Sequence, residues 1–363
     1  MSSILRHIMR FDLVIVGSAL LLSGIGLLSL YSSSLSNGDF SNFTKQAIFL
    51  SIGLLCMVAL SFFDWRLLKN EPFLILLLYG IGIAALLGLF FFAHEVRGTK
   101  RWFRIWEISV DPIEYVKLIL IVLMAKFFSF RHIEMYRIQH IILSGLYFAI
   151  PIAFVFFQPD LGTAMLLVIL WITLLLVSGI KIRHFLALVG MGILIVALGW
   201  TFFMHDYQKD RIFAFLEPEL DPFGIGWSQL QSKIAIGNGG LLGAGFGKGT
   251  QTQHSFLSEP QTDFIFAAIA EEFGFLGVFA LFTLFIILTG RILSIGIHAK
   301  NNFPRLFATG IACLLVVQFA VNIGMNLGLL PIAGLPLPLV SYGGSSLILT
   351  YAGLGILQSI HTH

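Results

Sequence analysis

A group of carboxylates lies where the longest polar stretch of the chain meets an apolar run. Asp263 opens the run, Glu259 precedes it, and Glu271 and Glu272 follow about two turns later. Asp263 could accept a proton from a substrate hydroxyl as a general base. It could also only cap a helix, since a carboxylate is favoured at the positive end of the helix dipole. The two glutamates favour a chemical role, because adjacent carboxylates inside an apolar segment require a polar environment.

Glu114 and Lys117 form a second candidate pair near the start of another apolar run. Residues three apart lie on one face of a helix, so the two side chains can pair. Both lie a turn or more below the expected membrane surface, where an ionisable pair is costly unless it is buried in protein or lines a hydrated cavity. We therefore expect this pair to serve a function inside the protein.

Two short segments add charge at what we expect to be the same side. Residues 97–106 combine four cations with two tryptophans and could attract an anion at headgroup depth: Arg97, Lys100, Arg101, Trp102, Arg104 and Trp106. Arginine and tryptophan also anchor proteins at that depth without any chemistry, so both interpretations stay open. Asp160 lies beside Gln158 in the turn QPDLGTA, where it could bind substrate or cap a helix.

A polar, glycine-rich loop covers residues 206–262 and contains Arg211 near its start. Residues 229–237 could form a short amphipathic helix or a re-entrant element. Seven glycines between positions 237 and 249 would allow the backbone to approach a ligand closely. The run GAGFGKGT does not predict a nucleotide-binding phosphate loop, because Gly249 rather than Ser or Thr follows Lys248. Farther on, prolines in residues 328–346 forbid a continuous helix, and SYGGSS supplies hydroxyls.

The elements that must position these residues are membrane helices. The chain is 57% hydrophobic and only 11% charged, which excludes an ordinary soluble protein. Ten apolar runs are long enough to span a bilayer, roughly 13–33, 46–63, 72–93, 112–130, 138–157, 161–179, 184–204, 263–290, 306–330 and 338–360. We therefore predict an all-α integral membrane protein. Residues 1–363 form one polytopic domain, with residues 206–262 as a large extracytoplasmic loop between helices 7 and 8.

The distribution of basic residues predicts the orientation. With both termini in the cytoplasm, twelve of the 22 Lys and Arg residues fall in the inner segments, most of them short loops, as the positive-inside tendency requires. The first span is too long for a signal peptide and is followed by many more, so we expect it to be retained. Cys56 and Cys313 lie inside predicted spans, where a structural disulfide is not expected, and no Cys/His spacing typical of a metal site occurs.

Several long motifs resemble the SEDS family of membrane glycosyltransferases, and its RodA branch more closely than its FtsW branch. They are MHDYQ with the following Arg211, QSKIAIGNGG, GTQ, TDFIFAAIAEE, NIGM, GLPLPLVSYGGSS and SIHTH. The resemblance spans nearly the whole chain. Two departures affect loops: Ser258 replaces a proline of the family, and the chain has DPIE, so that Asp111 and Ile113 differ while Glu114 and Lys117 are kept.

The resemblance implies an activity, a location and partners. Relatives polymerise lipid II, a disaccharide-peptide on undecaprenyl pyrophosphate, into peptidoglycan outside the cytoplasmic membrane. Expected partners are a class B penicillin-binding protein, other membrane proteins of the elongation complex and membrane lipid, but no nucleic acid. Asp263 matches the essential aspartate. The expected substrate-binding residues are Glu114, Lys117, Asp160, Arg101, Arg211, Gln231, Ser232, Lys233, Glu259, Thr262, Ser341 and Tyr342.

The chemistry suits these residues. Asp263 would accept the proton of the attacking sugar hydroxyl. Lys117, Arg101 and Arg211, in that order, are candidates to stabilise the departing pyrophosphate. A divalent cation, Mg²⁺ or Mn²⁺, could share that task with Asp263 as a ligand, although no closed metal site is evident. The alternative function is a flippase for lipid-linked cell-wall precursors, favoured by Glu271 and Glu272. A scaffold without activity is the third reading.

Overall fold

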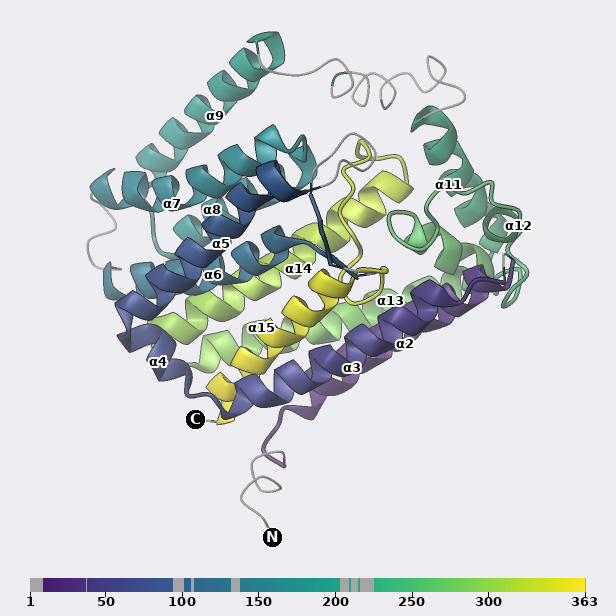
Figure 1. Ribbon diagram of the computed structural model, residues 1–363, viewed down its shortest axis with the longest axis horizontal. Coiled ribbons are helices and arrows are strands. Elements are labelled where there is room, and N and C mark those ends of the chain that lie inside the picture. The colour runs from purple at the N-terminus through teal and green to yellow at the C-terminus, as the bar shows by residue number, and fades with distance from the viewer. Residues whose placement is uncertain are drawn as a thin grey trace.

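Ten long helices follow one another in the order that the sequence predicts (Figure 1). The structure is a computed structural model, which describes residues 9–36, 38–93, 101–105, 108–131, 138–202, 209, 215 and 225–362. The helices are α2 (Leu13–Leu35), α3 (Ser41–Phe62), α5 (Pro72–Phe92), α6 (Pro112–Arg131), α7 (Ile138–Phe157), α8 (Leu161–Val177), α9 (Ile182–Phe202), α13 (Ile265–His298), α14 (Asn302–Asn326) and α15 (Gly344–Thr362). The prediction of an all-α membrane protein is confirmed in its main features.

Seven of the described helices are long and apolar enough to cross a membrane. The other three are α6, α8 and α15. Helix α6 carries Glu114, Lys117 and Lys126 in its sequence, and α8 has only 17 residues. Helix α15 is less apolar, because Ser, Gly and Gln interrupt it. The number of ten membrane crossings therefore stays a prediction.

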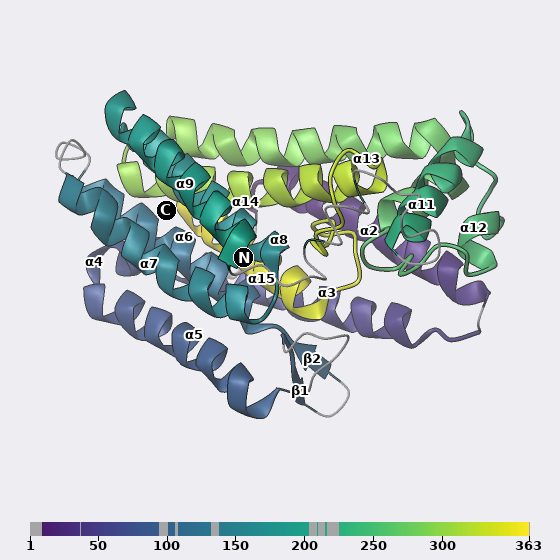
Figure 2. The ribbon, with the colours of Figure 1, turned by 90° about the horizontal axis from the view of Figure 1, so that it is seen from above.

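Smaller elements gather near one end of the bundle (Figure 2). Helix α11 (Ile225–Gly239) contains the helix expected over 229–237, and α12 (Thr250–Gln253) follows the glycine-rich segment. An antiparallel hairpin of β1 (Phe103–Ile105) and β2 (Ile108–Val110) pairs Phe103 with Val110. The prediction of helices alone missed this hairpin. It leads the chain from Arg101 directly into α6, and this connection fixes the position of the Arg101 backbone.

Helix α6 runs through the middle of the bundle. Every residue from Ile119 to Ala125 is buried, and α5, α14 and α15 pack around the helix. One hydrophobic core connects residues from Ile15 to Leu357. An ionisable side chain on α6 must therefore find its partners inside the protein.

Both termini lie on one side of the bundle. The N–H of Asp12, at the start of α2, donates to Oε1 of Gln358 near the end of α15 (2.9 Å). In return, Nε2 of Gln358 donates to the Asp12 carbonyl (3.2 Å). The Asp12 carboxylate also receives the Nε–H of Arg291 in α13 (2.5 Å). This arrangement fits an even number of crossings. The short helix α4 (Trp65–Asn70) lies at the same side.

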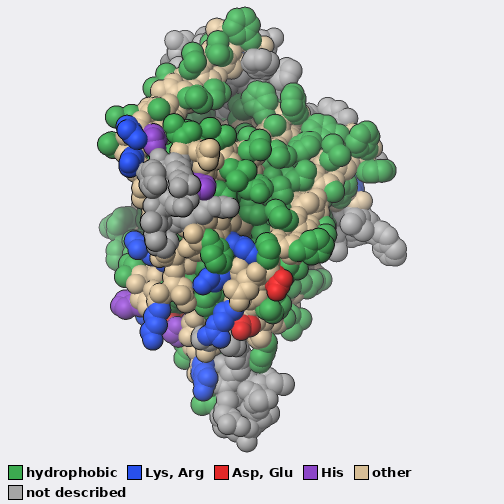
Figure 3. All heavy atoms as spheres, turned by 90° about the vertical axis from the view of Figure 1, so that its left-hand side faces the viewer, with side chains coloured by type: hydrophobic (Ala, Val, Ile, Leu, Met, Phe, Trp, Pro, Cys, Tyr) green, Lys and Arg blue, Asp and Glu red, His purple; other side chains and the backbone are tan. Residues whose placement is uncertain are grey.

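Lys and Arg side chains gather on the face shown in Figure 3, where few acidic side chains are visible. Exposed basic residues occur at the ends of helices and in the connections between them: Arg66, Lys181, Arg183, Lys300 and Arg305. These are among the residues that the sequence assigns to the cytoplasmic side. That this face meets the cytoplasm stays a prediction from the positive-inside tendency.

Candidate functional site

Arg101 lies at the centre of a charged cluster. Its Nη2 atom is 3.0 Å from Oδ2 of Asp160 and 3.5 Å from Oδ2 of Asp111. The Arg101 side chain is 16% exposed, and those of Asp160 and Asp111 are 4% and 12% exposed. One guanidinium thus connects the hairpin to the starts of α8 and α6.

The two carboxylates are fixed by the helices that follow them. Asp160 caps α8, since its Oδ1 accepts the N–H of Thr163 (3.1 Å). Oδ1 of Asp111 accepts the N–H of Ile113 (3.2 Å) at the start of α6. Capping and ion pairing use different oxygens of the same carboxylate. The cap that the sequence offered as one role of Asp160 is therefore present, the ion pair with Arg101 was not expected, and substrate binding by Asp160 stays a prediction.

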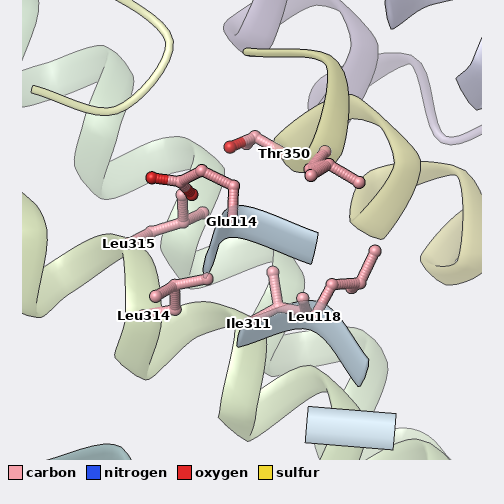
Figure 4. A pocket seen from close by; sticks show the side chains of 7 residues that line it. Glu114, Leu118, Ile311, Leu314, Leu315 and Thr350 are labelled. Atoms are coloured by element: carbon pink, nitrogen blue, oxygen red, sulfur yellow. The ribbon is translucent and has the colours of Figure 1, made fainter. Parts of the chain in front are cut away.

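Glu114 and Lys117 form the pair that their spacing predicts. The distance between Nζ of Lys117 and Oε1 of Glu114 is 2.7 Å, and the side chains are 1% and 11% exposed. Glu114 also lines a narrow crevice between α6, α14 and α15, whose volume of about 10 Å³ suits one water molecule. Its carboxylate and the hydroxyl of Thr350 lie at one end of the crevice, and leucine and isoleucine side chains form the rest (Figure 4).

Asp263 belongs to the same electrostatic cluster. Burial acts to lower the pKa of Arg101, but nearby carboxylates raise that pKa above its ordinary value. In decreasing order of effect these carboxylates belong to Asp160, Asp111, Glu114 and Asp263. Asp263 is therefore close enough to Arg101 for their charges to interact.

The balance of charge in the cluster is negative. Among the described residues it contains four carboxylates, from Asp111, Glu114, Asp160 and Asp263, and two cations, from Arg101 and Lys117, which gives −2 when all are ionised. Burial raises the pKa of Asp111 to about 6, although Arg101 and Lys117 oppose this effect. Each of the two described cations already has a carboxylate partner.

The Asp263 backbone is held by two asparagines of α14. Nδ2 of Asn326 and Nδ2 of Asn322 donate to the Asp263 carbonyl, at 2.9 Å and 3.1 Å. Both asparagines are fully buried, whereas Asp263 is partly exposed. The sequence points to this helix only through the motif NIGM, and we did not predict a role for either asparagine.

The segment before Asp263 is tied to the loop before α15. The Ser341 hydroxyl donates to the Thr262 carbonyl (2.7 Å), and the N–H of Tyr342 donates to the Gln261 carbonyl (2.9 Å). The Glu259 carbonyl accepts the N–H of Thr262 (3.2 Å). The structure thus brings Glu259, Thr262, Ser341 and Tyr342 together next to Asp263, as the sequence predicts.

The three expected residues of α11 have different environments. Gln231 and Ser232 are buried, and the Ser232 hydroxyl donates to the Asn326 carbonyl (2.9 Å). Lys233 is exposed. Ser232 therefore stabilises the packing of α11 on α14, and only Lys233 presents its side chain to the surroundings. Arg211 lies outside the described residues.

Glu271 and Glu272 serve the loop that precedes Asp263. The Glu271 carboxylate accepts the N–H groups of Gln251 (2.8 Å) and Thr252 (3.1 Å) at the start of α12, and also both threonine hydroxyls, those of Thr250 and Thr252. Glu272 accepts hydrogen bonds from Ser32 and Gln253. Both glutamates do have the polar environment that the sequence requires, and protein groups supply it.

The glycines approach a helix rather than a ligand. Helix α13 is broken at Gly274, and the N–H groups of Ala244 and Gly245 donate to the carbonyls of Glu271 (2.9 Å) and Glu272 (3.1 Å). A Cβ at Gly243 would lie 2.1 Å from the Glu272 carbonyl oxygen. The broken helix thus occupies the space beside Gly239, Gly243 and Gly249, while a close approach of the other glycines to a ligand stays a prediction.

The charged cluster contains no closed metal site. In the part of the chain that the structure describes, no group of three or more His, Cys, Asp or Glu side chains could hold a metal ion. A Mg²⁺ ion, however, commonly uses one or two carboxylates together with phosphate oxygens of a substrate. Asp263 can supply such a carboxylate, so the donor set fits a cation that arrives with a pyrophosphate.

Comparison with known proteins identifies the family. Residues 12–363 match the FtsW/RodA/SpoVE family of cell cycle proteins. The chain belongs to this family.

Solved and curated members of the FtsW/RodA/SpoVE family cover nearly the whole chain. It is 39% identical over 335 residues to the peptidoglycan glycosyltransferase MrdB of Escherichia coli K12, covering 91% of this chain and 88% of MrdB. It superimposes with a TM-score of 0.83 and 30% identity on a chain from a peptidoglycan synthase complex that coordinates polymerization and crosslinking, covering 97% of each. The crystal structure of RodA from Thermus thermophilus gives a TM-score of 0.73 at 30% identity, covering 97% and 96%.

The structure brings many of the predicted site residues together, but sequence reasoning missed three residues of this region. Asp111 was noted only as a departure from the family pattern, although an aspartate before the first proline of a helix is a signal for a cap. Asn322 and Asn326 were not singled out. Their signal was two amides four residues apart in an apolar helix, and such amides share a face.

Proposed function

We propose that this protein is a peptidoglycan glycosyltransferase that polymerises lipid II into glycan strands during cell-wall elongation. Family membership and the activity named for MrdB support the reaction class. The observation that carries the assignment to this chain is the position of Asp263, a partly exposed residue just before α13, in the segment where the Ser341 hydroxyl bonds the Thr262 carbonyl.

In the proposed reaction, Asp263 is the general base. The hydroxyl oxygen of one lipid-linked sugar attacks the anomeric carbon of the other, and its proton passes to the Asp263 carboxylate. The bond between that carbon and the pyrophosphate oxygen breaks, and the electron pair leaves with undecaprenyl pyrophosphate. The substrate-binding residues proposed from the sequence would surround this centre, with Glu114, Lys117, Asp160 and Arg101 on the side of α6 and α8.

The negative balance of the cluster supports a divalent cation as a cofactor. A pyrophosphate leaving group adds further negative charge to four carboxylates and two cations. Lys117 and Arg101 are already paired, so they supply less positive charge than their number suggests. When bound by Asp263 and the pyrophosphate oxygens, Mg²⁺ or Mn²⁺ would stabilise the charge that develops there.

A flippase is the alternative function, and its main support is weakened. Buried acidic residues near the middle of a membrane protein are typical of transport pathways. Glu271 and Glu272 instead bind α12 and Ser32, which accounts for their burial by local structure. We therefore favour glycosyl transfer over transport.

The same comparisons support a partner and a membrane setting for this protein. The neighbouring structure of a synthase complex couples polymerization to crosslinking, which supports a class B penicillin-binding protein as partner. We further propose one membrane domain over residues 1–363 in the inner membrane, with both termini in the cytoplasm and Asp263 at the outer face. The bonded pair Asp12 and Gln358 supports termini on one side.

Reconstitution with purified lipid II tests the function. The full chain, with and without its cognate penicillin-binding protein and with Mg²⁺, Mn²⁺ or a chelator, should produce long glycan strands only when a cation is present. Asp263→Ala should abolish the strands without unfolding the protein. Polymer made at the normal rate by Asp263→Ala would remove Asp263 from the mechanism. Movement of labelled lipid II across sealed vesicles without polymerisation would favour the flippase.

A further inference from the structure

One side-chain amide connects the start of α13 to Asp263. Helix α13 begins at Ile265, so the N–H of Ala267 belongs to the first turn, where N–H groups have no acceptor within the helix. This N–H donates to Oδ1 of Asn326 (3.2 Å), while Nδ2 of the same asparagine donates to the Asp263 carbonyl (2.9 Å). The Asn326 amide thus supplies an acceptor to the first turn of α13 and a donor to the residue that precedes the helix.

Asn322 completes the arrangement. Its Nδ2 group donates to the Asp263 carbonyl (3.1 Å) and to the Leu335 carbonyl (2.9 Å). The second N–H of Asn326 is directed to the Asn322 carbonyl (2.8 Å). A primary amide has two N–H donors, so both donors of both side chains are in use. Two amides therefore join α14, the start of α13 and the loop before α15.

These contacts determine where the Asp263 side chain begins. The direction of a Cα–Cβ bond follows from the orientation of the peptide groups on either side of it. The peptide carbonyl of Asp263 accepts two hydrogen bonds from buried groups, so its orientation is fixed by α14 and not by α13 alone. Small displacements of a catalytic group are costly, since about 1 Å can lower the rate about 100-fold.

We infer that Asn322 and Asn326 are positioning residues for Asp263. They act through its backbone and do not touch the reacting atoms. This inference rests on the proposed function, because it assigns their role through the general base. It also accounts for two fully buried amides four residues apart in α14.

Kinetics of two alanine variants test the inference. Asn322→Ala and Asn326→Ala, each purified with the cognate penicillin-binding protein, should lower kcat about 10- to 100-fold. The KM for lipid II should stay within about threefold of the wild-type value, because no substrate contact is lost. An unchanged kcat, or a rise in KM that accounts for the whole loss, would overturn the inference.

A nearly isosteric variant separates positioning from folding. In Asn326→Asp, a protonated carboxyl can still accept from Ala267 and donate to the Asp263 carbonyl, whereas a carboxylate can only accept. The activity of Asn326→Asp relative to wild type should therefore rise as the pH is lowered from about 8 to 6, while the relative activity of Asn326→Ala stays constant. Equal pH profiles for the two variants would contradict a role for this hydrogen bond.

Two controls make the outcome unambiguous. Gln318 lies in α14, about one turn before Asn322 and two turns before Asn326. It is 2% exposed, and its Nε2 has no hydrogen-bond partner among the described residues. Gln318→Leu should therefore keep a normal kcat. This result would show that the loss of a buried amide from α14 does not by itself lower kcat. Asp263→Ala is measured in parallel. If Asp263→Ala is active, the proposed mechanism fails. If it is inactive while both asparagine variants are normal, only the positioning role fails.

Discussion

The ammonium group of Lys117 lies 2.7 Å from Oε1 of Glu114 inside α6, and the lysine is only 1% exposed. Two charges removed from water depend on each other, because losing one leaves the other buried without a partner. The pair also lies beside Thr350 and the crevice between α6, α14 and α15. Its effect on stability and its effect on catalysis can therefore be separated by single and double substitutions.

Replacing Lys117 alone should destabilise the protein. Lys117→Met leaves the Glu114 carboxylate buried and unpaired, which costs about 3–5 kcal/mol. The double variant Glu114→Gln with Lys117→Met should recover much of this loss, because no isolated charge remains. Neither variant should polymerise lipid II. Thermal unfolding in detergent and a polymerisation assay measure the two effects, and a double variant with normal activity would show that the pair is only structural.

Asp111 should make stability depend on pH. Its pKa is raised from an ordinary value of 3.8 to about 6, so the folded state holds this proton more tightly than the unfolded state. Stability from this group is therefore present at low pH and is lost as the pH rises from about 4 to 6, by about 3 kcal/mol. Asp111→Asn imitates the protonated form and should melt at a higher temperature than wild type above pH 6.5.

The same variant provides its own control at low pH. Below about pH 4 the wild-type carboxyl is protonated in both states, so the melting temperatures of Asp111→Asn and wild type should converge. A constant difference from pH 4 to 7 would show that the asparagine acts by packing and not by removing a charge. A lower melting temperature at pH 7 would show that the ion pair with Arg101 outweighs the cost of burial.

The helices could be predicted from the sequence because hydropathy is a local property. Each of the ten apolar runs overlaps one long helix of the structure, and the helix over 229–237 was also expected. The hairpin of β1 and β2 could not be predicted with the same rules, since its strands have only three residues each. Short strands carry too few residues for a period-two pattern to stand out.

The site was predictable only in part, because its contacts connect distant segments. The pair Glu114 and Lys117 is three residues apart, so local spacing was enough. Arg101 meets Asp160 across 59 positions, and the sequence gives their types but not their contact. The glycines near 243 show the same limit. The sequence shows that glycines are conformationally free, but it does not show that Gly243 must pack against α13 near the helix break at Gly274. The two glycines are too far apart in the sequence for a local pattern to connect them.

Gly243 should not tolerate a side chain. Its φ is +82°, and a Cβ would lie 2.1 Å from the Glu272 carbonyl oxygen. Gly243→Ala should therefore separate the glycine segment from the break in α13 and lower the melting temperature markedly. Gly237 is the matched control, because it lies in α11 and no atom is within 4 Å of its added Cβ. Gly237→Ala should be neutral or slightly stabilising.

The two adjacent glutamates should respond differently to the loss of charge. Glu271 accepts four hydrogen bonds at the start of α12, and a glutamine would direct an N–H₂ group at some of these donors. Glu271→Gln should therefore loosen residues 240–258, at a cost of about 1–3 kcal/mol per unsatisfied buried group. Oε2 of Glu272 has no partner among the described residues, so Glu272→Gln should cost less.

Hydrogen exchange of residues 240–258 distinguishes the two variants. Faster exchange in Glu271→Gln with a nearly normal KM fits a structural role for Glu271. Unchanged exchange together with altered passage of lipid II across vesicles would instead restore the transport hypothesis.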